Sequence, residues 1–198
     1  MREGTGAGER NGYRLVVVGA SAGGLSALVA VLAKLPSDFP LPLAIVQHLD
    51  PRHESLLASI LGRRTTLPVH EARDRDAMVA AHVYVAPPGC HMVVGPGYAV
   101  HLTHEAPVHF VRPAADRLFE SAARSCGPVI AVILTGTGSD GAAGAAAVRA
   151  SGGVVIVQDQ ATSAFFGMPQ AAIDSGVVNY ILPVDDIGPA LMTLIGTN

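Results

Sequence analysis

Three residues whose types could together carry out nucleophilic hydrolysis stand just after short apolar segments of the chain. Ser21 follows the run YRLVVVG, His48 ends the run LPLAIVQH, and Asp140 comes shortly after PVIAVILTG. A serine hydroxyl attacks a carbonyl carbon when a histidine removes its proton and a carboxylate orients that histidine. The three residues therefore predict hydrolysis through an acyl intermediate, provided that the fold brings them together.

Simpler roles compete with this interpretation at two of the three positions. Ser21 and Asp140 each precede a predicted helix, where serine and aspartate commonly cap the first turn. His48 has no such preference, and a loop follows it. The other seven histidines are interpreted as surface or loop residues: His53, His70, His82, His91, His101, His104 and His109.

The segments that must position these residues alternate between apolar strands and helices. Strands are expected at 13–19, 41–48, 128–136, 153–159 and 177–182, and helices at 25–35, 53–63, 115–126, 140–151 and 185–195. This alternation predicts an α/β fold with a doubly wound, mostly parallel sheet and helices on both faces. Short runs between Pro and Gly turns at 82–103 predict a small antiparallel hairpin insertion. Residues 1–12 are expected to form a flexible tail, and residues 13–198 one domain.

The carboxyl ends of parallel strands lie along one edge of a sheet, where α/β proteins bind their ligands. Ser21, His48 and Asp140 are all expected at that edge. The stretch GASAG at 19–23 also fits the G-x-S-x-G pattern of a strand–serine–helix turn. The order Ser, His, Asp along the chain nevertheless differs from the Ser, Asp, His order of the α/β-hydrolases, which disfavours that fold.

A dinucleotide-binding fold also begins with a strand, a glycine turn and a helix. Here, however, Ser21 occupies the place of the second glycine of G-x-G-x-x-G, where the backbone approaches the pyrophosphate. The next strand ends in His48 instead of the acidic residue that binds a ribose, although Asp50 lies two residues further on. This alternative stays open but fits less well than hydrolysis.

The composition excludes several other classes. Hydrophobic residues make up 49% of the 198 residues and charged residues 15%, which is typical of a globular domain with a sizeable core. A net charge of −3 without a basic run gives no reason to expect nucleic acid binding. No signal peptide and no long apolar stretch is visible, so we expect a cytoplasmic protein without membrane insertion. The two cysteines and the histidines lack metal-site spacing, and no metal or organic cofactor is expected.

Six blocks of the sequence carry a resemblance to a known family. The chain resembles the catalytic domain of the bacterial chemotaxis protein-glutamate methylesterases of the CheB type, from about Arg14 to the C-terminus. The blocks are GASAGG at 19–24, QH at 47–48, HVYVAPPGCHM at 82–92, RPAADRLFESAA at 112–123, ILTGTGSDGAAG at 133–144 and FFGMPQAAI at 165–173.

The resemblance implies a function and roles for individual residues. It makes Ser21 the nucleophile, His48 the base and Asp140 the triad carboxylate, and it implies the same doubly wound sheet. Family members hydrolyse γ-glutamyl methyl esters on the cytoplasmic helices of methyl-accepting chemoreceptors, and some also deamidate receptor glutamines. The backbone N–H groups of Ala22 and of Thr137, which stands where the family commonly has methionine, are the expected oxyanion donors.

A substrate groove is expected beside these residues. The loop TSAFFGMP at 162–169 should emerge at the same sheet edge, with Phe166 and Met168 as candidate groove residues, although ordinary core positions are an equal alternative. Arg112 is expected to shape the groove or to pair with receptor carboxylates. Asp140 is expected to have no electrostatic rival among the nearby acids, and Asp116 and Asp159 are interpreted as structural residues.

Two further expectations concern the chain as a whole. Only a dozen residues precede the first strand, so a receiver domain like that of typical family members is not expected, and the chain is either a free-standing esterase or an excised domain. Because no long insertion can form a lid, the site should be a shallow cleft suited to a protein substrate. The competing hypothesis is a degenerate esterase fold that binds a partner without hydrolysis.

Overall fold

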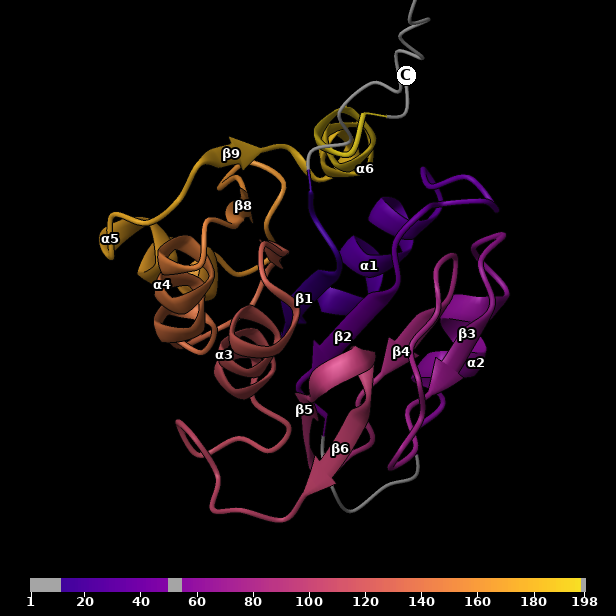
Figure 1. Cartoon of the computed structure of the whole chain (residues 1–198). Coiled ribbons are helices and arrows are strands. Elements are labelled where there is room, and N and C mark those ends of the chain that lie inside the picture. Colours follow the sequence, from indigo (N-terminus) through magenta and orange to yellow (C-terminus); the bar gives the residue numbers. More distant parts are fainter. Residues whose placement is uncertain (1–11, 50–54, 197–198) are drawn as a thin grey trace, which may run out of the picture.

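The computed structural model describes residues 12–49 and 55–196 of the chain. Apart from Gly12, the predicted tail at 1–12 lies outside the described residues, as does the beginning of the helix predicted at 53–63. Figure 1 shows the arrangement of the elements along the chain.

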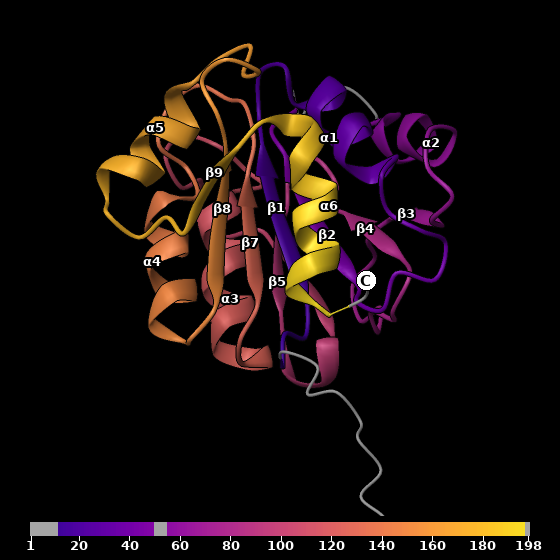
Figure 2. The same ribbon diagram turned by 90° about the horizontal axis from the view of Figure 1, so that it is seen from above.

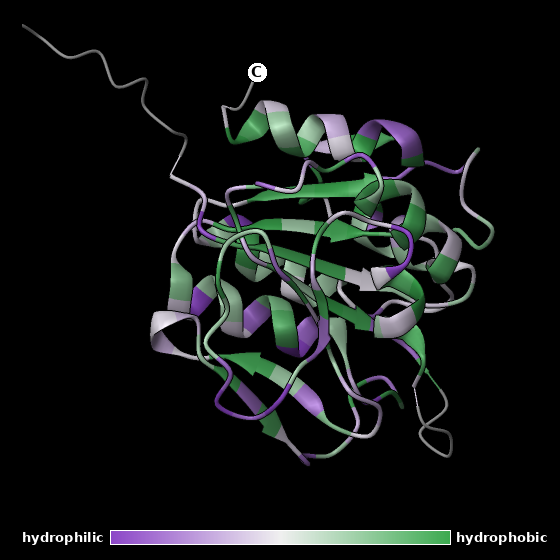
Figure 3. Ribbon diagram, turned by 90° about the vertical axis from the view of Figure 1, so that its right-hand side faces the viewer, coloured by the Kyte–Doolittle hydropathy of each residue, from purple (hydrophilic) through white to green (hydrophobic). Residues whose placement is uncertain are grey.

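A parallel sheet of seven strands forms the centre of the described chain, in the order β3-β4-β2-β1-β7-β8-β9. Its strands are largely runs of Val, Ile, Leu and Ala, and β1, β2, β7 and β8 are buried throughout, as expected of strands covered on both faces. Figure 3 shows the strands of this sheet in the colour of hydrophobic residues. The strands are β1 (Val16–Ala20), β2 (Leu43–Gln47), β3 (Val69–Glu71), β4 (Val83–Val85), β7 (Ile130–Ile133), β8 (Val154–Gln158) and β9 (Tyr180–Leu182).

Helices cover both faces of the sheet (Figure 2). Helices α1 (Gly24–Leu32), α2 (Leu57–Gly62) and α6 (Val184–Leu194) share one hydrophobic core with the sheet. On the other face, α3 (Ala115–Cys126), α4 (Ala142–Ala150) and α5 (Gly167–Asp174) share the second core with the antiparallel pair β5 (His91–Val94) and β6 (Val100–Thr103). A short 3₁₀ helix, η1 (Pro96–Tyr98), connects β5 and β6. None of the described helices is long and apolar enough to cross a membrane.

The predicted fold class is confirmed, with three local corrections. The first part of the predicted hairpin region, Val83–Val85, is a parallel strand of the main sheet, and only β5 and β6 pair in antiparallel fashion. The edge strand β3 was missed because its three residues include two polar ones, so no apolar run marks it. Helix α5 was missed because its first residues, GMP, resemble a turn.

The order of the strands places a crevice next to β1. The chain adds strands on one side of β1 through β2 and on the other side through β7, so the direction of winding reverses there. Ligands of such sheets bind at this reversal, beyond the carboxyl ends of the strands. Ser21, His48 and Asp140 follow β1, β2 and β7, the three strands that meet at the reversal.

Candidate active site

Ser21 stands in a tight turn between β1 and α1 that leaves its hydroxyl free. Its backbone N–H donates to the carbonyl of Thr135 at 3.0 Å, and its own carbonyl accepts the N–H of Gly24 at 2.9 Å. Gly23 adopts a positive φ of 78° and is the N-cap of α1, which has no side-chain cap. Ser21 therefore does not cap the helix, and the simpler interpretation of this serine is wrong.

His48 and Asp140 form a close pair at the same sheet edge. The Nε2–H of His48 donates to Oδ2 of Asp140 at 2.7 Å, and the His48 side chain is 12% exposed. A neutral imidazole that donates through Nε2 keeps Nδ1 as an acceptor. The N–H of His48 also donates to the carbonyl of Ala20 at 3.0 Å, which fixes the residue beside the end of β1.

The carboxylate of Asp140 is buried and accepts two backbone hydrogen bonds besides that of His48. The N–H of Ala115 donates to Oδ2 at 2.6 Å, and the N–H of Asp116 donates to Oδ1 at 3.0 Å. Burial alone would raise the pKa of Asp140, but the hydrogen bonds from His48 and from these two N–H groups hold it below its ordinary value. Asp140 is thus kept ionised, as the partner of a catalytic histidine must be.

Asp116 and Asp140 cap the N-termini of two neighbouring helices reciprocally. Asp140, just before α4, binds the first N–H groups of α3, while Oδ1 of Asp116 in α3 accepts the N–H of Gly141 at 2.9 Å and of Gly144 at 2.7 Å. Burial raises the pKa of Asp116; the Gly144 N–H opposes this rise, and the neighbouring charge of Asp140 adds to it. These hydrogen bonds agree with the structural role expected of Asp116.

Two backbone donors next to Ser21 are unoccupied. Among the described residues, the N–H groups of Ala22 and Thr137 make no hydrogen bond. Ala22 follows Ser21, and Thr137 lies in the loop after β7, which is linked to the Ser21 turn by the 3.0 Å bond from Ser21 to Thr135. Both groups are available to bind the oxygen of a tetrahedral intermediate.

The hydroxyl of Ser21 makes no hydrogen bond with His48, or with any other group, in the part of the chain that the structure describes. The triad is therefore half assembled: the His48–Asp140 pair is closed and the Ser21–His48 bond is open. Catalytic hydrogen bonds of unliganded enzymes are often open in this way and close when substrate binds.

Comparison with known proteins connects this geometry to a family. A family model described as CheB methylesterase matches residues 16–191. The chain belongs to the CheB methylesterase family. The solved catalytic domain of the CheB methylesterase from Thermotoga maritima is 37% identical, with a TM-score of 0.90 over 92% of this chain and 99% of that one.

Two curated CheB-type relatives extend the comparison. A protein-glutamate methylesterase/protein-glutamine glutaminase 2 from Anaeromyxobacter dehalogenans is 47% identical over 91% of this chain and 53% of its own length. A protein-glutamate methylesterase/protein-glutamine glutaminase from Symbiobacterium thermophilum is 40% identical over 99% of this chain and 54% of its own. The chain thus spans about half the length of these relatives.

Two residues that support the CheB site were not singled out from the sequence. Gln47 is buried, and its Nε2 donates to the carbonyl of Ser21 at 2.7 Å and of His48 at 3.1 Å. The hydroxyl of Thr135 lies 3.0 Å from the carbonyl of Ala22 and accepts the N–H of Phe165 at 2.9 Å. Both are polar residues at the end of or just after an apolar strand, which was the signal that could have revealed them.

The segment expected beside the site in this CheB-family chain does lie there. The N–H of Gly136 donates to the carbonyl of Phe165, and the N–H of Met168 donates to the carbonyl of Gly136, both at 2.9 Å. Phe166 is half-buried next to this loop. Met168 was predicted to line the groove, but its side chain is fully buried against Gly136. Met168 packs beside Gly136 and Ser21, and its buried side chain cannot contact a substrate.

Arg112 lies beside His48 in a small cleft of about 180 Å³. Its Nη1 donates to the carbonyls of His104 at 3.0 Å and Glu105 at 2.8 Å, so the side chain holds the loop that precedes it. A second cleft, of about 420 Å³, begins at Ser21 and is walled by Leu25, Leu56 and Ile60 among others. Two of the candidate catalytic residues, Ser21 and His48, therefore each line a different cleft.

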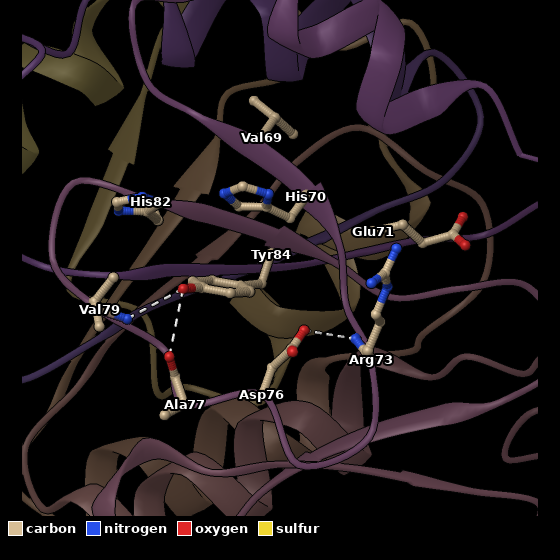
Figure 4. Close-up of a pocket in the computed structure, with 9 residues that line it drawn as sticks. All are labelled: Val69, His70, Glu71, Arg73, Asp76, Ala77, Val79, His82 and Tyr84. Carbon is tan, nitrogen blue, oxygen red and sulfur yellow. Dashed lines mark hydrogen bonds between the residues drawn. The ribbon is translucent and has the colours of Figure 1, made fainter.

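A larger cavity of about 600 Å³ lies elsewhere and is lined by β3 and by residues of the segment 73–84, which leads into β4 (Figure 4). His70 and His82 stack there with ring centroids 5.4 Å apart, and the Tyr84 hydroxyl accepts the N–H of Val79 at 3.2 Å. None of the predicted catalytic residues lines it. Within the described ranges, no group of three or more potential ligands could hold a metal ion.

One of the histidines assigned to the surface is a core residue. His91 in β5 is fully buried; its Nδ1 accepts the N–H of Ala114 at 3.2 Å, and its Nε2–H donates to the carbonyl of Ala106 at 3.1 Å. Burial lowers the pKa of His91, which keeps the ring neutral. His53 lies outside the described residues.

Proposed function

We propose that this chain is a protein-glutamate methylesterase that hydrolyses γ-glutamyl methyl esters on the cytoplasmic helices of methyl-accepting chemoreceptors. The observation that carries the proposal is the 2.7 Å bond between His48 and the buried carboxylate of Asp140, one strand away from the free hydroxyl of Ser21. The names of the curated relatives support a protein-glutamate methyl ester as the substrate. A substrate on cytoplasmic receptor helices implies that the protein acts in the cytoplasm.

The proposed reaction has two steps. Nδ1 of His48 takes the proton of Ser21 as the hydroxyl oxygen bonds to the ester carbon, and Asp140 stabilises the resulting imidazolium. The N–H groups of Ala22 and Thr137 bind the oxyanion. The imidazolium returns the proton to the methoxide, which leaves as methanol. A water molecule, deprotonated by His48, then hydrolyses the acyl-serine and releases the glutamate.

The same residues support a second activity, the deamidation of receptor glutamines. The curated relatives are named protein-glutamine glutaminases as well as methylesterases. Amide hydrolysis needs the same nucleophile and oxyanion donors, with ammonia in place of methanol as the leaving group protonated by His48.

Methanol release from a methylated receptor fragment tests the proposal. We expect turnover by the wild-type chain and a decrease in kcat of at least about 10⁴-fold in Ser21→Ala, because removal of a triad nucleophile leaves only binding and oxyanion stabilisation. Ser37→Ala, which changes an exposed serine in the turn between α1 and β2, is the matched control. A folded wild-type chain that releases no methanol would favour the non-hydrolytic binding module.

A further inference from the structure

The turn at Val108–Val111 contains residues that such a turn rarely accepts. Val108 and Val111 exchange two backbone hydrogen bonds, of 3.1 and 2.9 Å, which close a turn with His109 and Phe110 at its centre. Both central residues have positive φ, 49° and 65°. Glycine, asparagine and aspartate prevail at these positions, because a larger L side chain crowds its own backbone there.

The side chain of Phe110 gains nothing in the folded chain that offsets this strain. Its relative exposure is 102%, so the ring is not packed against the rest of the molecule. An isolated exposed aromatic residue is ordinary, but one at a strained backbone position is not explained by folding. The residue choice at 110 therefore points to a contact made with another molecule.

The position of the turn shows where that contact occurs. Phe110 lines the small cleft that also contains His48 and Arg112. The turn is held in place, because Nε2 of His109 lies 3.0 Å from Oδ2 of Asp116, the residue that exchanges caps with Asp140. The ring is thus presented at the catalytic cleft on a fixed support.

We propose that Phe110 is a specificity-determining residue, whose ring packs against an apolar side chain of the protein segment that carries the ester. This inference rests on the proposed function, since it assumes a protein substrate at His48. The other walls of the cleft include Leu49, Pro107 and Val111, which favour an apolar partner. A lysine or arginine stacked on the ring would instead approach the positive charge of Arg112.

Substitutions at Phe110 separate recognition from folding. Phe110→Gly and Phe110→Asn suit the positive φ and remove the ring, so we expect melting temperatures equal to or above that of wild type. Phe110→Tyr keeps the ring and the strain. For a methylated chemoreceptor fragment relative to a short methyl-ester peptide, the ratio of kcat/KM should decrease about tenfold in the first two variants and stay near wild type in the third.

Affinity for the same fragment, measured in a Ser21→Ala background, makes the test independent of turnover. We expect Phe110→Gly to weaken binding about tenfold and Phe110→Tyr to preserve it. Wild-type affinity in Phe110→Gly, or an equal loss in Phe110→Tyr, would overturn the inference. Failure of the wild-type chain to release methanol would count against the proposed function alone, because the binding comparison stands without it.

Discussion

At the scale of single residues, Asp140 shows how a buried charge is kept. Its side chain is almost inaccessible to water, yet three hydrogen bonds, from His48, Ala115 and Asp116, stabilise the ionised form. Charge-assisted hydrogen bonds to backbone N–H groups at a helix start are among the strongest that a carboxylate can accept. These hydrogen bonds stabilise the ionised form of Asp140 and also hold its carboxylate beside His48.

Replacement of Asp140 by asparagine should lower activity far more than it perturbs the fold. The amide has no charge to stabilise the imidazolium of His48, and its NH₂ group must face either the N–H groups of His48 and Ala115 or that of Asp116, so we expect kcat to fall by about 10³–10⁴-fold. Methanol release under saturating substrate measures this. Asp174→Asn, at an exposed carboxylate near the end of α5, is the control.

The Asp140→Asn variant also tests how the free energy of unfolding depends on pH. The pKa of Asp140 is lower in the folded chain than its ordinary value of 3.8, so its contribution is fully present above about pH 4 and is lost as the pH falls through the folded pKa. The pKa of Asp116 is raised in the folded chain, so its contribution to stability is present at low pH and is lost as the pH rises. Urea unfolding at several pH values should show the stability difference between wild type and Asp140→Asn shrinking below about pH 4; a constant difference would contradict the assignment.

Neighbouring atoms leave no room for a side chain at Gly136. An added Cβ would lie 2.8 Å from Cβ of Ser21 and would also overlap Sδ of Met168. Gly136→Ala should therefore displace Ser21 and lower kcat by about 10–100-fold, with a loss of about 1–3 kcal/mol in stability. Gly62→Ala, whose new Cβ would be 3.8 Å from the nearest neighbour, should leave kcat unchanged.

Strand-end position was sufficient to predict Ser21, His48 and Asp140 as neighbours, because parallel strands bring their carboxyl ends together. The bond between His48 and Asp140 that a triad requires is present as predicted, whereas the Ser21–His48 bond is open, because it depends on side-chain rotamers that strand-end position does not determine. Strand-end position also missed the link between Asp116 and Asp140, which joins the N-termini of two separate helices and leaves no pattern in either.

At the scale of elements, α3 and α4 depend on each other for their first turns. Neither helix has a side-chain cap from its own N-cap residue. Asp140, just before α4, accepts N–H groups at the start of α3, and Asp116 in α3 accepts N–H groups at the start of α4. The N–H groups at a helix start need such acceptors when they are buried. The pair should therefore form cooperatively.

Loss of the Asp116 carboxylate tests this dependence. Asp116→Ala leaves the buried N–H groups of Gly141 and Gly144 without acceptors, and we expect the free energy of unfolding to fall by about 2–3 kcal/mol. Asp116→Asn, which keeps one acceptor oxygen, should lose less. Chemical denaturation measures both, and equal losses in the two variants would contradict the capping role.

The elements that the sequence failed to predict are the ones that tertiary pairing creates. β3 is a strand only because Val69, His70 and Glu71 pair with β4 at the sheet edge. β4 looked like part of a hairpin because its three residues lie close to the Pro-Pro-Gly turn, whereas it pairs with β2. The longer apolar segments needed no such help and were predicted correctly.

At the scale of the whole molecule, the candidate catalytic residues Ser21 and His48 each line a different open cleft. The cleft at Ser21 is bordered by apolar side chains that remain exposed, with Leu56 at 67%. Such a site contacts little of a small ester but can contact an extended surface. Its shape favours a substrate held on both sides of the reacting group.

The chain should accordingly prefer a folded receptor fragment to a short peptide ester. Remote contacts help to align the ester with Ser21, so we expect kcat/KM for the methylated fragment to exceed that for the peptide by at least about tenfold. Comparison of the two substrates at equal methyl-ester concentration measures this, with Ser21→Ala as the background rate. Equal values would indicate a general small-ester hydrolase.

The exchange of caps between α3 and α4 also bears on how inactive descendants of this fold would be recognised. A lineage under no selection for hydrolysis could replace the hydroxyl of Ser21 freely, because that group bonds to nothing among the described residues. The same lineage could not discard Asp140 so easily, since two backbone N–H groups of α3 would lose their acceptor. An aspartate at this position is therefore a marker of the architecture, and a serine at position 21 is the better marker of a working enzyme.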